Sequence, residues 1–548
     1  MSQLPEFGAQ STAEAVRAVA AAIAASDYPR ASRLAEGAMA QGHIHPTLLN
    51  ARAIWLEHQG RDEEALALFQ RARALTTKDA RLLNAIGLCL TRLYRLEEAI
   101  EVFDEAIRIE PGYAATHQRK AVVLGMAGLP KEAEQAQKRA VQLDPRNHEA
   151  LAGLASIAAR KGDVDSARDY AQRALRGDPN NATAQAALAL GEIARGDFHP
   201  AEQRLLPLFD GARLTGHARA VLLGLLGDAL DGQGRFAEAF AAYRDANDCL
   251  KTMHAPRFVG KPGVTDIVET LIGHLETTDP ATWTLSGAGD DVAGGPRRHV
   301  FLLGFHRSGT TLLEQILEGH PDVVTLEERD FLAEPAEQYL TGQTGLDRLA
   351  ALEGPALEHA RTAYWQRVQK FGLDVSGKVF VDKHPFNTIK LPLILKLFPK
   401  AKVLFALRDP RDVVLSCFRR HFEINAVMFE YLTLEGLAHL YDRVMCLGAL
   451  CRRKLPLPFL EHRYEDMVGD FDTSVRRVCD FLEVPWSESV RDFSATASGL
   501  DIRSPSAGQV RRGLYGEGVG QWRRYATEMA PVLPRLQTWI DAYGYPAE

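Results

Sequence analysis

Small and apolar residues recur through the first half of the chain with a period of 34 residues. Pro111, Pro145 and Pro179 are spaced by this interval, and pairs of small residues seven positions apart repeat in one phase. That spacing places both members of a pair on the same face of a helix, where a neighbouring helix can approach closely. The pattern predicts stacked helical hairpins. The pairs are Ala31/Ala38, Ala65/Ala72, Ala99/Ala106, Ala133/Ala140, Ala167/Ala174 and Ala201/Leu208.

The segment 82–111 resembles the tetratricopeptide repeat (TPR), a helical hairpin of about 34 residues. The seven-residue spacing recurs at Ala239 and Ala246 after a four-residue slip, so we expect about seven repeats in a solenoid over 11–253. The resemblance implies a concave groove suited to an extended protein or peptide partner. The matching positions of the segment are Gly87, Tyr94, Ala99, Phe103 and Ala106.

The second half of the chain has a different pattern. The period ends near residue 255, and Gly, Asp and Pro gather before residue 298, so 254–297 is predicted to be a linker. Short apolar runs then alternate with helical stretches, which predicts an α/β domain over 298–548 with a parallel sheet covered on both faces. Strands are expected at 299–303, 379–381, 403–407 and 459–462.

Composition narrows the class of protein. The 548 residues are 46% hydrophobic and 25% charged with a net charge of −7, which is typical of a globular protein and argues against a general nucleic-acid binder. Six cysteines without a Cys-x-x-Cys pair indicate neither a disulfide framework nor a zinc site, and no metal is expected. No signal peptide or membrane-spanning segment is evident, so a cytoplasmic location is expected.

The first predicted strand runs into the stretch GFHRSGTT, residues 304–311. Its glycines permit a tight turn, and a helix from about Thr310 would present free N–H groups to an anion. A nucleoside-triphosphate loop has Lys at the position of Thr310, whereas here Arg307 supplies the positive charge. This favours a nucleotide with one 5′-phosphate that carries a sulfate; an ordinary glycine turn is the alternative. The predicted cradle is Arg307, Ser308, Gly309, Thr310 and Thr311.

A second anion-binding stretch follows the strand over 403–407. Arg408 lies at the carboxyl end of that strand, where open α/β sheets bind ligands, and the next helix carries Ser416 and Arg420. The planar guanidinium of Arg408 suits a phosphate group. The alternative is a surface ion pair between Arg408 and a neighbouring Asp.

Together the two stretches resemble the nucleotide-binding segments of sulfotransferases that use 3′-phosphoadenosine 5′-phosphosulfate (PAPS), and most closely the tyrosylprotein sulfotransferases. The resemblance implies that Arg408 and Ser416 hold the 3′-phosphate of PAPS, with Arg420 and the cradle at the same nucleotide. In HPDVVTLEER it implies Glu328 as the catalytic base. Glu327 and His320 remain alternatives, as does a merely solvated Glu328.

The resemblance assigns further residues. Lys383 would stabilise charge on the leaving phosphate, assisted by Ser506 in a glycine-rich lid. Tyr464 would stack on the adenine, although a core tyrosine is an equal alternative. Arg511 would contact the nucleotide and compensate for Gln521, which replaces a phosphate-binding lysine of that family; Arg523 and Arg524 are alternatives for this role. His306 replaces a proline of the cradle.

The expected activity is sulfuryl transfer from PAPS to a hydroxyl, with tyrosine of a protein or peptide recruited by the repeats as the leading acceptor. A glycan or small-molecule hydroxyl is a second possibility. A TPR scaffold with an inactive nucleotide-binding domain is a third. The oligomeric state, for which a homodimer is one option, is left open.

Overall fold

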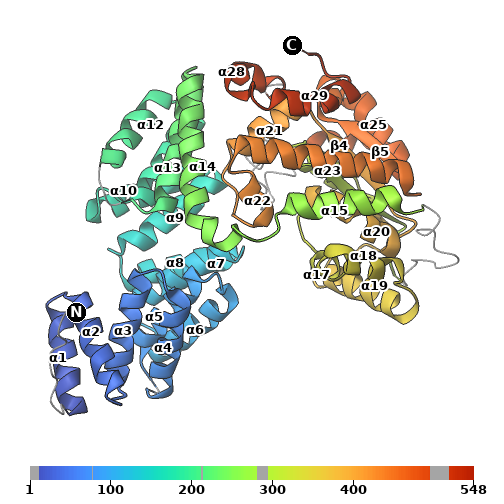
Figure 1. Cartoon of the computed structure of the whole chain (residues 1–548). Helices are drawn as coiled ribbons and strands as arrows, with labels where there is room; N and C mark the ends of the chain where they lie inside the picture. The colour runs from blue at the N-terminus through green and yellow to red at the C-terminus, as the bar shows by residue number, and fades with distance from the viewer. Residues whose placement is uncertain (1–10, 77, 211–213, 280–293, 494–517, 548) are drawn as a thin grey trace. The chain divides into compact units, whose positions relative to one another are not determined.

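A computed structural model describes residues 11–76, 78–210, 214–279, 294–493 and 518–547. Packing divides the chain into two compact units, Met1–Gly211 and Ala212–Glu548. Figure 1 shows the helical pairs of the first unit and the mixed helix and strand structure of the second. Within the described residues, no helix combines the length and the apolar composition that crossing a membrane requires.

The first unit is a solenoid of antiparallel helix pairs, as the sequence predicts. The alanines of the seven-residue pairs are all buried where the helices meet. Gly87 shows why small residues are needed, because a Cβ there would lie 2.6 Å from Cζ of Phe103 on the partner helix. The helices are α1 Thr12–Ala24, α2 Tyr28–Ala40, α3 Pro46–His58, α4 Asp62–Ala74, α5 Ala80–Arg92, α6 Leu96–Ile109, α7 Ala114–Met126, α8 Pro130–Leu143, α9 His148–Lys161, α10 Val164–Gly177, α11 Ala182–Arg195, α12 Phe198–Leu205 and η1 Leu206–Asp210.

The second unit begins with a helix pair that the sequence assigns to the last repeat. These helices, α13 Gly216–Gly232 and α14 Phe236–Phe258, cluster with the domain that follows them. The Asn247 side chain of α14 donates to the Phe418 carbonyl at 3.0 Å. Phe240 of α14 also stacks on Phe418, with ring centroids 5.2 Å apart. The final repeat pair is therefore packed onto the C-terminal domain.

The predicted linker contains an ordered helix, α15 Val264–Thr277. Its apolar residues, at helical spacing, are buried and pack against α23 Leu434–Lys454. Lys454 Nζ donates to the carbonyl oxygens of Leu275 and Glu276 at 2.6 and 2.7 Å. The linker prediction is wrong over this helix, because the spacing of Val264, Val268, Leu271 and Leu275 is that of one helical face.

A parallel five-stranded sheet forms the centre of the second unit, in the order β2-β3-β1-β4-β5. Because all strands run the same way, their carboxyl ends meet at one edge, and the order reverses beside β1, where such sheets bind ligands. The edge strand β2 is not among the strands that the sequence predicts. The strands are β1 Arg298–Gly304, β2 Val323–Glu327, β3 Val379–Lys383, β4 Lys402–Leu407 and β5 Phe459–Arg463.

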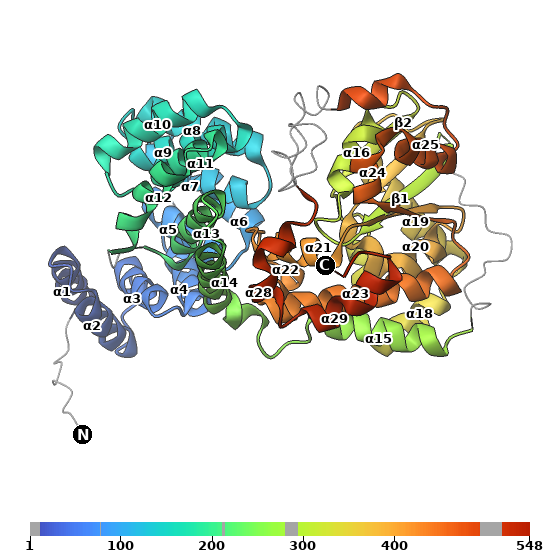
Figure 2. The same cartoon turned by 90° about the horizontal axis from the view of Figure 1, so that it is seen from above.

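Helices cover both faces of the sheet (Figure 2). On one face, Leu313 and Ile316 of α16 and Val475 of α25 pack on the strands. On the other face, helices α19, α20 and α23 enclose an aromatic core that includes Tyr364 and Phe398. The described helices of this unit, in addition to α13, α14, α15 and α23, are α16 Thr310–Glu318, α17 Ala333–Tyr339, α18 Gly342–Ala350, α19 Gly354–Gln369, η3 Pro385–Lys390, α20 Leu391–Leu397, α21 Pro410–Phe418, α22 Ala426–Glu430, α24 Tyr464–Gly469, α25 Phe471–Leu482, η4 Glu488–Asp492, η6 Gln521–Tyr525, α28 Ala526–Met529 and α29 Leu533–Ala542.

Candidate functional site

The loop between β1 and α16 is shaped by two glycines that other residues could not replace without strain. Gly304 has φ +152°, and a Cβ there would lie 2.6 Å from the Ala406 carbonyl oxygen on β4. Gly309 has φ +92°, and a Cβ there would lie 2.7 Å from Cδ2 of Tyr464. Arg307 adopts a left-handed φ of +68° without being glycine, a strained conformation that clusters at functional sites. The loop ends where α16 begins at Thr310, as predicted.

Four predicted nucleotide-binding residues from separate segments meet beside this loop. Arg307 Nε donates to Ser416 Oγ of α21 at 3.0 Å. Arg408 Nη1 donates to the Arg307 carbonyl at 3.0 Å, and the Arg408 guanidinium lies 4.9 Å from the ring centroid of Tyr464. Among the described residues, Arg408 Nε has no partner although it is buried. Two guanidinium groups and a hydroxyl thus converge at the carboxyl ends of β1 and β4.

The alternative interpretation of Arg408, an ion pair with a neighbouring Asp, is not what the structure shows. Asp409 is bound by Arg411, whose Nη2 lies 2.8 Å from Asp409 Oδ2. Within the described parts of the chain, no carboxylate forms an ion pair with Arg408. Its second terminal nitrogen, Nη2, donates to the Gly518 carbonyl. Arg408 is therefore hydrogen-bonded to backbone carbonyls, and it acts on the carboxyl groups of Asp412 and Glu465 only through longer-range electrostatics.

Lys383 ends β3 and is fully buried among carboxyl groups. Its Nζ lies 2.8 Å from Glu328 Oε1, 3.1 Å from Glu314 Oε2 and 3.9 Å from Glu327 Oε1. Burial lowers the pKa of Lys383, but the carboxylates of Glu314, Glu328 and Glu327 outweigh burial and raise it overall. The ammonium group therefore stays charged at any physiological pH. Because Lys383 pairs with Leu302 of β1, it lies next to the strand that enters the loop.

Glu328 follows β2 directly and is more accessible than its partner. Its side chain is 30% exposed whereas that of Lys383 is buried completely. Burial acts to raise the pKa of Glu328, but the Lys383 ammonium lowers it below its ordinary value. The residue has φ +35°, which is uncommon for a bulky side chain, and its N–H donates to the Lys383 carbonyl at 2.8 Å. Glu328 is thus an ionised, reachable proton acceptor beside a fixed cation.

The two alternatives for the base differ in position. His320 is 2% exposed, and its Nδ1 accepts the Asp322 N–H at 3.1 Å while Nε2 lies 2.7 Å from the Pro485 carbonyl. One nitrogen therefore binds the turn between α16 and β2, and the other binds the backbone that follows α25. Glu327 is farther from Lys383 than Glu328 is. The geometry favours Glu328 among the three.

The remaining predicted residues are placed less favourably or not described. Arg420 lies beyond the end of α21 and pairs with Asp228 of α13, Nη1 to Oδ2 at 3.4 Å. Ser506 and Arg511 lie outside the described residues. Gln521 begins η6 and accepts from Arg419 at 3.5 Å. Tyr464, expected to stack on adenine, has the Arg408 guanidinium over its ring.

Two carboxyl groups of the site were missed from the sequence. Glu314 is 1% exposed on the inner side of α16, and its only signal was a charge within an apolar helix. Asp412 of α21 accepts the N–H groups of Gly520 and Trp522 at 2.7 and 2.9 Å. It therefore fixes the C-terminal part of the segment 506–525 that is predicted to be a lid.

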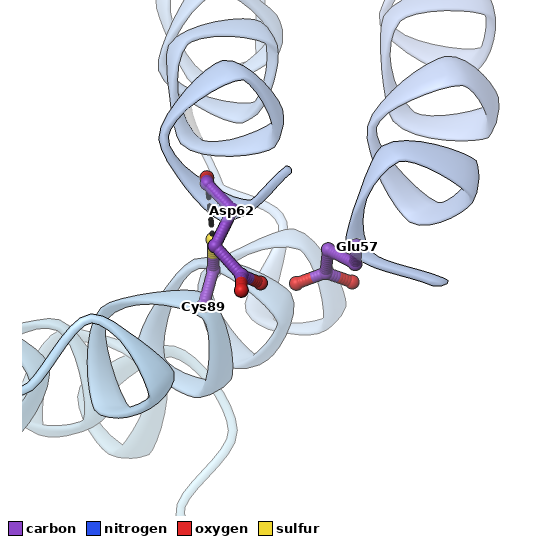
Figure 3. A group of neighbouring side chains, drawn as sticks. All are labelled: Glu57, Asp62 and Cys89. Atoms are coloured by element: carbon purple, nitrogen blue, oxygen red, sulfur yellow. Dashed lines mark hydrogen bonds between the residues drawn. The ribbon is translucent and has the colours of Figure 1, made fainter. Parts of the chain in front are cut away.

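A group of metal-type side chains also lies in the solenoid, where Glu57, Asp62 and Cys89 face one another (Figure 3). Arg92 pairs with both carboxylates, with its Nε 2.8 Å from Asp62 Oδ1. Cys89 Sγ donates to the Asp62 carbonyl at 3.3 Å, and burial raises the pKa of this thiol to about 12. The group is an ion-paired contact between repeats, in which the Arg92 guanidinium binds both carboxylates.

Comparison with known proteins agrees with this geometry. Residues 299–488 match the model of the sulfotransferase family, and residues 80–113 and 120–182 match models of the tetratricopeptide repeat. The chain is 26% identical over 262 residues to protein-tyrosine sulfotransferase 1 of Danio rerio, covering 43% of this chain and 71% of that protein. The chain therefore combines tetratricopeptide repeats with a sulfotransferase-family domain similar to protein-tyrosine sulfotransferases.

Two bacterial relatives are matched over smaller parts of their length. An uncharacterized protein of Aquifex aeolicus is 32% identical over 250 residues, which cover 44% of this chain and 32% of that one. Omega-hydroxy-beta-dihydromenaquinone-9 sulfotransferase Stf3 of Mycobacterium tuberculosis is 30% identical over 114 residues, covering 19% and 29%. The chain thus spans about a third of each of these two relatives.

Proposed function

We propose that the protein transfers the sulfuryl group of PAPS to a hydroxyl group, with a tyrosine of a protein or peptide held by the repeats as the acceptor. The observation that carries this proposal is the convergence of Arg307, Arg408 and Ser416 beside the Lys383–Glu328 pair. These groups come from five segments and meet at the carboxyl ends of neighbouring strands. A sulfotransferase-family match over the same residues supports it.

The residues present fit a nucleotide with both a 5′-phosphosulfate and a 3′-phosphate. The 304–311 loop lacks the lysine of triphosphate-binding loops at Thr310, so a smaller anion suits it better. Arg408 and Ser416 offer a separate cation and hydroxyl, and the buried, unpartnered Nε of Arg408 is a donor still available to an anion. In the proposal, the loop holds the 5′ end and Arg408 with Ser416 holds the 3′-phosphate.

The chemistry assigned to the site needs a base and a fixed cation. Transfer forms a bond between the acceptor oxygen and sulfur, and breaks the bond between sulfur and the bridging oxygen of the nucleotide. Glu328 takes the proton of the acceptor hydroxyl, for which it is ionised and partly exposed. Lys383 offers its charge to the oxygen that gains negative charge as that bond breaks. Ser506 is proposed to assist Lys383, and Arg511 to bind the nucleotide.

The acceptor is inferred from the relatives and the repeats. The similarity to protein-tyrosine sulfotransferases favours a phenolic hydroxyl. Stacked repeats form a concave surface that suits an extended chain. A second acceptor class, the omega-hydroxyl of a menaquinone-type lipid, is favoured by the similarity to the menaquinone sulfotransferase, although that similarity covers only 19% of this chain.

The test uses the full chain with ³⁵S-labelled PAPS and a whole-cell extract, fractionated into protein, lipid and small molecules. We expect label on protein with the wild type and a loss of about 100-fold or more with Glu328→Ala or Arg408→Ala. The matched controls are Glu337→Ala and Arg453→Ala, which change exposed residues away from the site. Both controls should label protein like the wild type.

Three results would decide against parts of the proposal. Undiminished labelling by Glu328→Ala and Arg408→Ala would refute the site. Label confined to the lipid fraction would mean that the acceptor is the menaquinone-type lipid and not tyrosine. Absence of any labelled product, together with an absence of PAPS binding in calorimetry, would leave the repeats as the functional part and the domain as an inactive relic.

A further inference from the structure

Glu314 is a buried carboxyl group, and the stability of the fold does not require a carboxyl group at this position. It lies on the sheet-facing side of α16 between Leu313 and Ile316, which belong to the apolar core. Taking a carboxylate and an ammonium out of water is unfavourable, and an apolar pair of similar volume would stabilise the fold at least as well. Neither oxygen of Glu314 accepts a hydrogen bond from another group in the described parts of the chain. Its Oε2 instead lies 3.1 Å from Lys383 Nζ.

Lys383 is thereby held from two sides by groups of different accessibility. Glu328 approaches from the exposed side at 2.8 Å, and Glu314 approaches from inside the core. An ammonium has three donors, and the hydrogen bond to Glu328 uses one of them. When Glu328 takes the acceptor proton it becomes neutral, and its hold on Lys383 weakens at the moment when the cation is needed.

We propose that Glu314 is a positioning residue for sulfuryl transfer, which keeps the Lys383 ammonium charged and in place at the end of β3 while Glu328 is protonated. This inference rests on the proposed function. In the step itself, the hydroxyl proton passes to Glu328, the oxygen–sulfur bond to the acceptor forms, and the electron pair of the broken bond stays on the nucleotide phosphate. Glu314 exchanges no proton and touches no reacting atom.

The charges around Glu314 make the inference testable through pH. The groups that act on it are Lys383 of β3 and Glu327 and Glu328 at the end of β2. Burial raises the pKa of Glu314 to about 8, against the attraction of Lys383. Below that pH the carboxyl group is increasingly neutral, and glutamine is its close mimic. Above it, the charge of Glu314 contributes to holding Lys383 and to raising its pKa.

The experiment compares kcat between about pH 6.5 and 9.5 for the wild type, Glu314→Gln and a control, Glu318→Gln. Glu318 lies one turn further along α16 and binds Thr325 instead of the lysine. We expect Glu314→Gln to reduce kcat by about 10- to 100-fold near pH 9 and by clearly less near pH 6.5, because displaced catalytic groups cost up to that factor. The control should follow the wild type. A ratio of wild type to Glu314→Gln that stays constant with pH would overturn the inference, since a purely structural effect has no such dependence.

A second variant covers the case in which Glu314→Gln does not fold, as judged by circular dichroism. Glu314→Asp keeps the charge but withdraws it from Lys383 by one methylene, so it should lower kcat while it retains the pH dependence of the wild type. Wild-type kcat in this variant would count against a positioning role.

Failure of the proposed function is recognised separately, by binding of the product analogue adenosine 3′,5′-bisphosphate. If the wild type binds this analogue but transfers no sulfate, the proposed function is wrong. The role of Glu314 is then tested by comparing the affinities of the wild type and Glu314→Gln for the analogue. Glu314→Gln should then weaken binding more at pH 9 than at pH 6.5. Equal affinities of the two proteins across this range would refute the role of Glu314.

Discussion

Arg419, just after α21, is bound to Asp231 of α13, with Nη2 3.0 Å from Asp231 Oδ2. The hydroxyl of Tyr525 in η6 donates to the same carboxylate, and the Arg419 guanidinium lies 5.2 Å from the ring of Tyr243 on α14. Ser416 lies on α21, so the helix pair before the sheet braces an element that carries part of the proposed nucleotide site.

Replacing Asp231 should destabilise the second unit. In Asp231→Ala the Arg419 guanidinium, 9% exposed, would lose its ion pair and keep the cost of its burial. We expect a loss of about 3 kcal/mol in the free energy of unfolding, measured by urea titration. The control Asp245→Ala breaks a pair that is more than half exposed and should cost less than about 1 kcal/mol. Equal effects of the two variants would contradict the brace.

Truncation should distinguish the last helix pair from the rest of the repeats. A chain that starts at residue 212 keeps α13 and α14, and should bind adenosine 3′,5′-bisphosphate like the full chain. A chain that starts at residue 256 exposes Phe418 and leaves Arg419 without Asp231, so it should lose binding and unfold at lower urea. The longer truncated form should also sulfate a free tyrosine peptide but lose its preference for the protein acceptor. Retained preference would refute recruitment by residues 1–211.

Arg408→Lys should weaken recognition of the 3′-phosphate selectively. Lysine keeps the charge but lacks the planar fork that binds two phosphate oxygens. Calorimetry should show an affinity for adenosine 3′,5′-bisphosphate lower by about 10- to 100-fold, which corresponds to one lost charge-assisted hydrogen bond. The affinity for adenosine 5′-phosphate, which lacks the 3′ group, should change by less than about threefold. A parallel loss for both nucleotides would assign Arg408 to the 5′ end.

Gly309→Ala should destabilise the protein by more than the cost of placing alanine in a left-handed conformation. A Cβ would lie 2.7 Å from the Tyr464 ring in addition to the strain of φ +92°. Gly372 has φ +69° with nothing within 4 Å of a new Cβ, so Gly372→Ala isolates the conformational cost of about 1 kcal/mol. Urea unfolding should show about 1 to 3 kcal/mol more for Gly309→Ala. Identical losses of unfolding free energy would mean that the Tyr464 ring moves to make room for the new Cβ.

Stability should fall as the pH drops below about 6.5. Burial lowers the pKa of His299 to about 3 and those of His306, His421 and His462 to about 4. Between those values and the unfolded value near 6.5, the unfolded chain binds more protons, so acid favours it. Each histidine contributes about 1.4 kcal/mol per pH unit in this window. His462→Gln should reduce the slope of the free energy of unfolding against pH by the contribution of one histidine. The control His359→Gln, at an exposed position, should leave this slope unchanged.

Local pattern was sufficient wherever neighbours in the sequence are also neighbours in space. The seven-residue alanine pairs predicted the solenoid, and the glycine loop with Arg307 predicted the start of α16, because helical spacing and turn geometry depend on a few consecutive residues. The resemblance to sulfotransferases supplied Arg408, Ser416, Lys383 and Glu328, and the sheet does place them along one edge. β2 was missed because a five-residue edge strand is too short to show a clear period.

Tertiary structure alone decided which partners these residues have. Glu314 is an ordinary helical glutamate in the sequence, and its role comes from β3 placing Lys383 3.1 Å away. The bond between Arg419 and Asp231 joins residues 188 positions apart. Contacts of this kind make the last helix pair part of the second unit and not of the repeat unit. The sequence by itself determined two kinds of architecture and the chemical types at the site. Their pairing, burial and charge depend on contacts between distant segments, which no local pattern records.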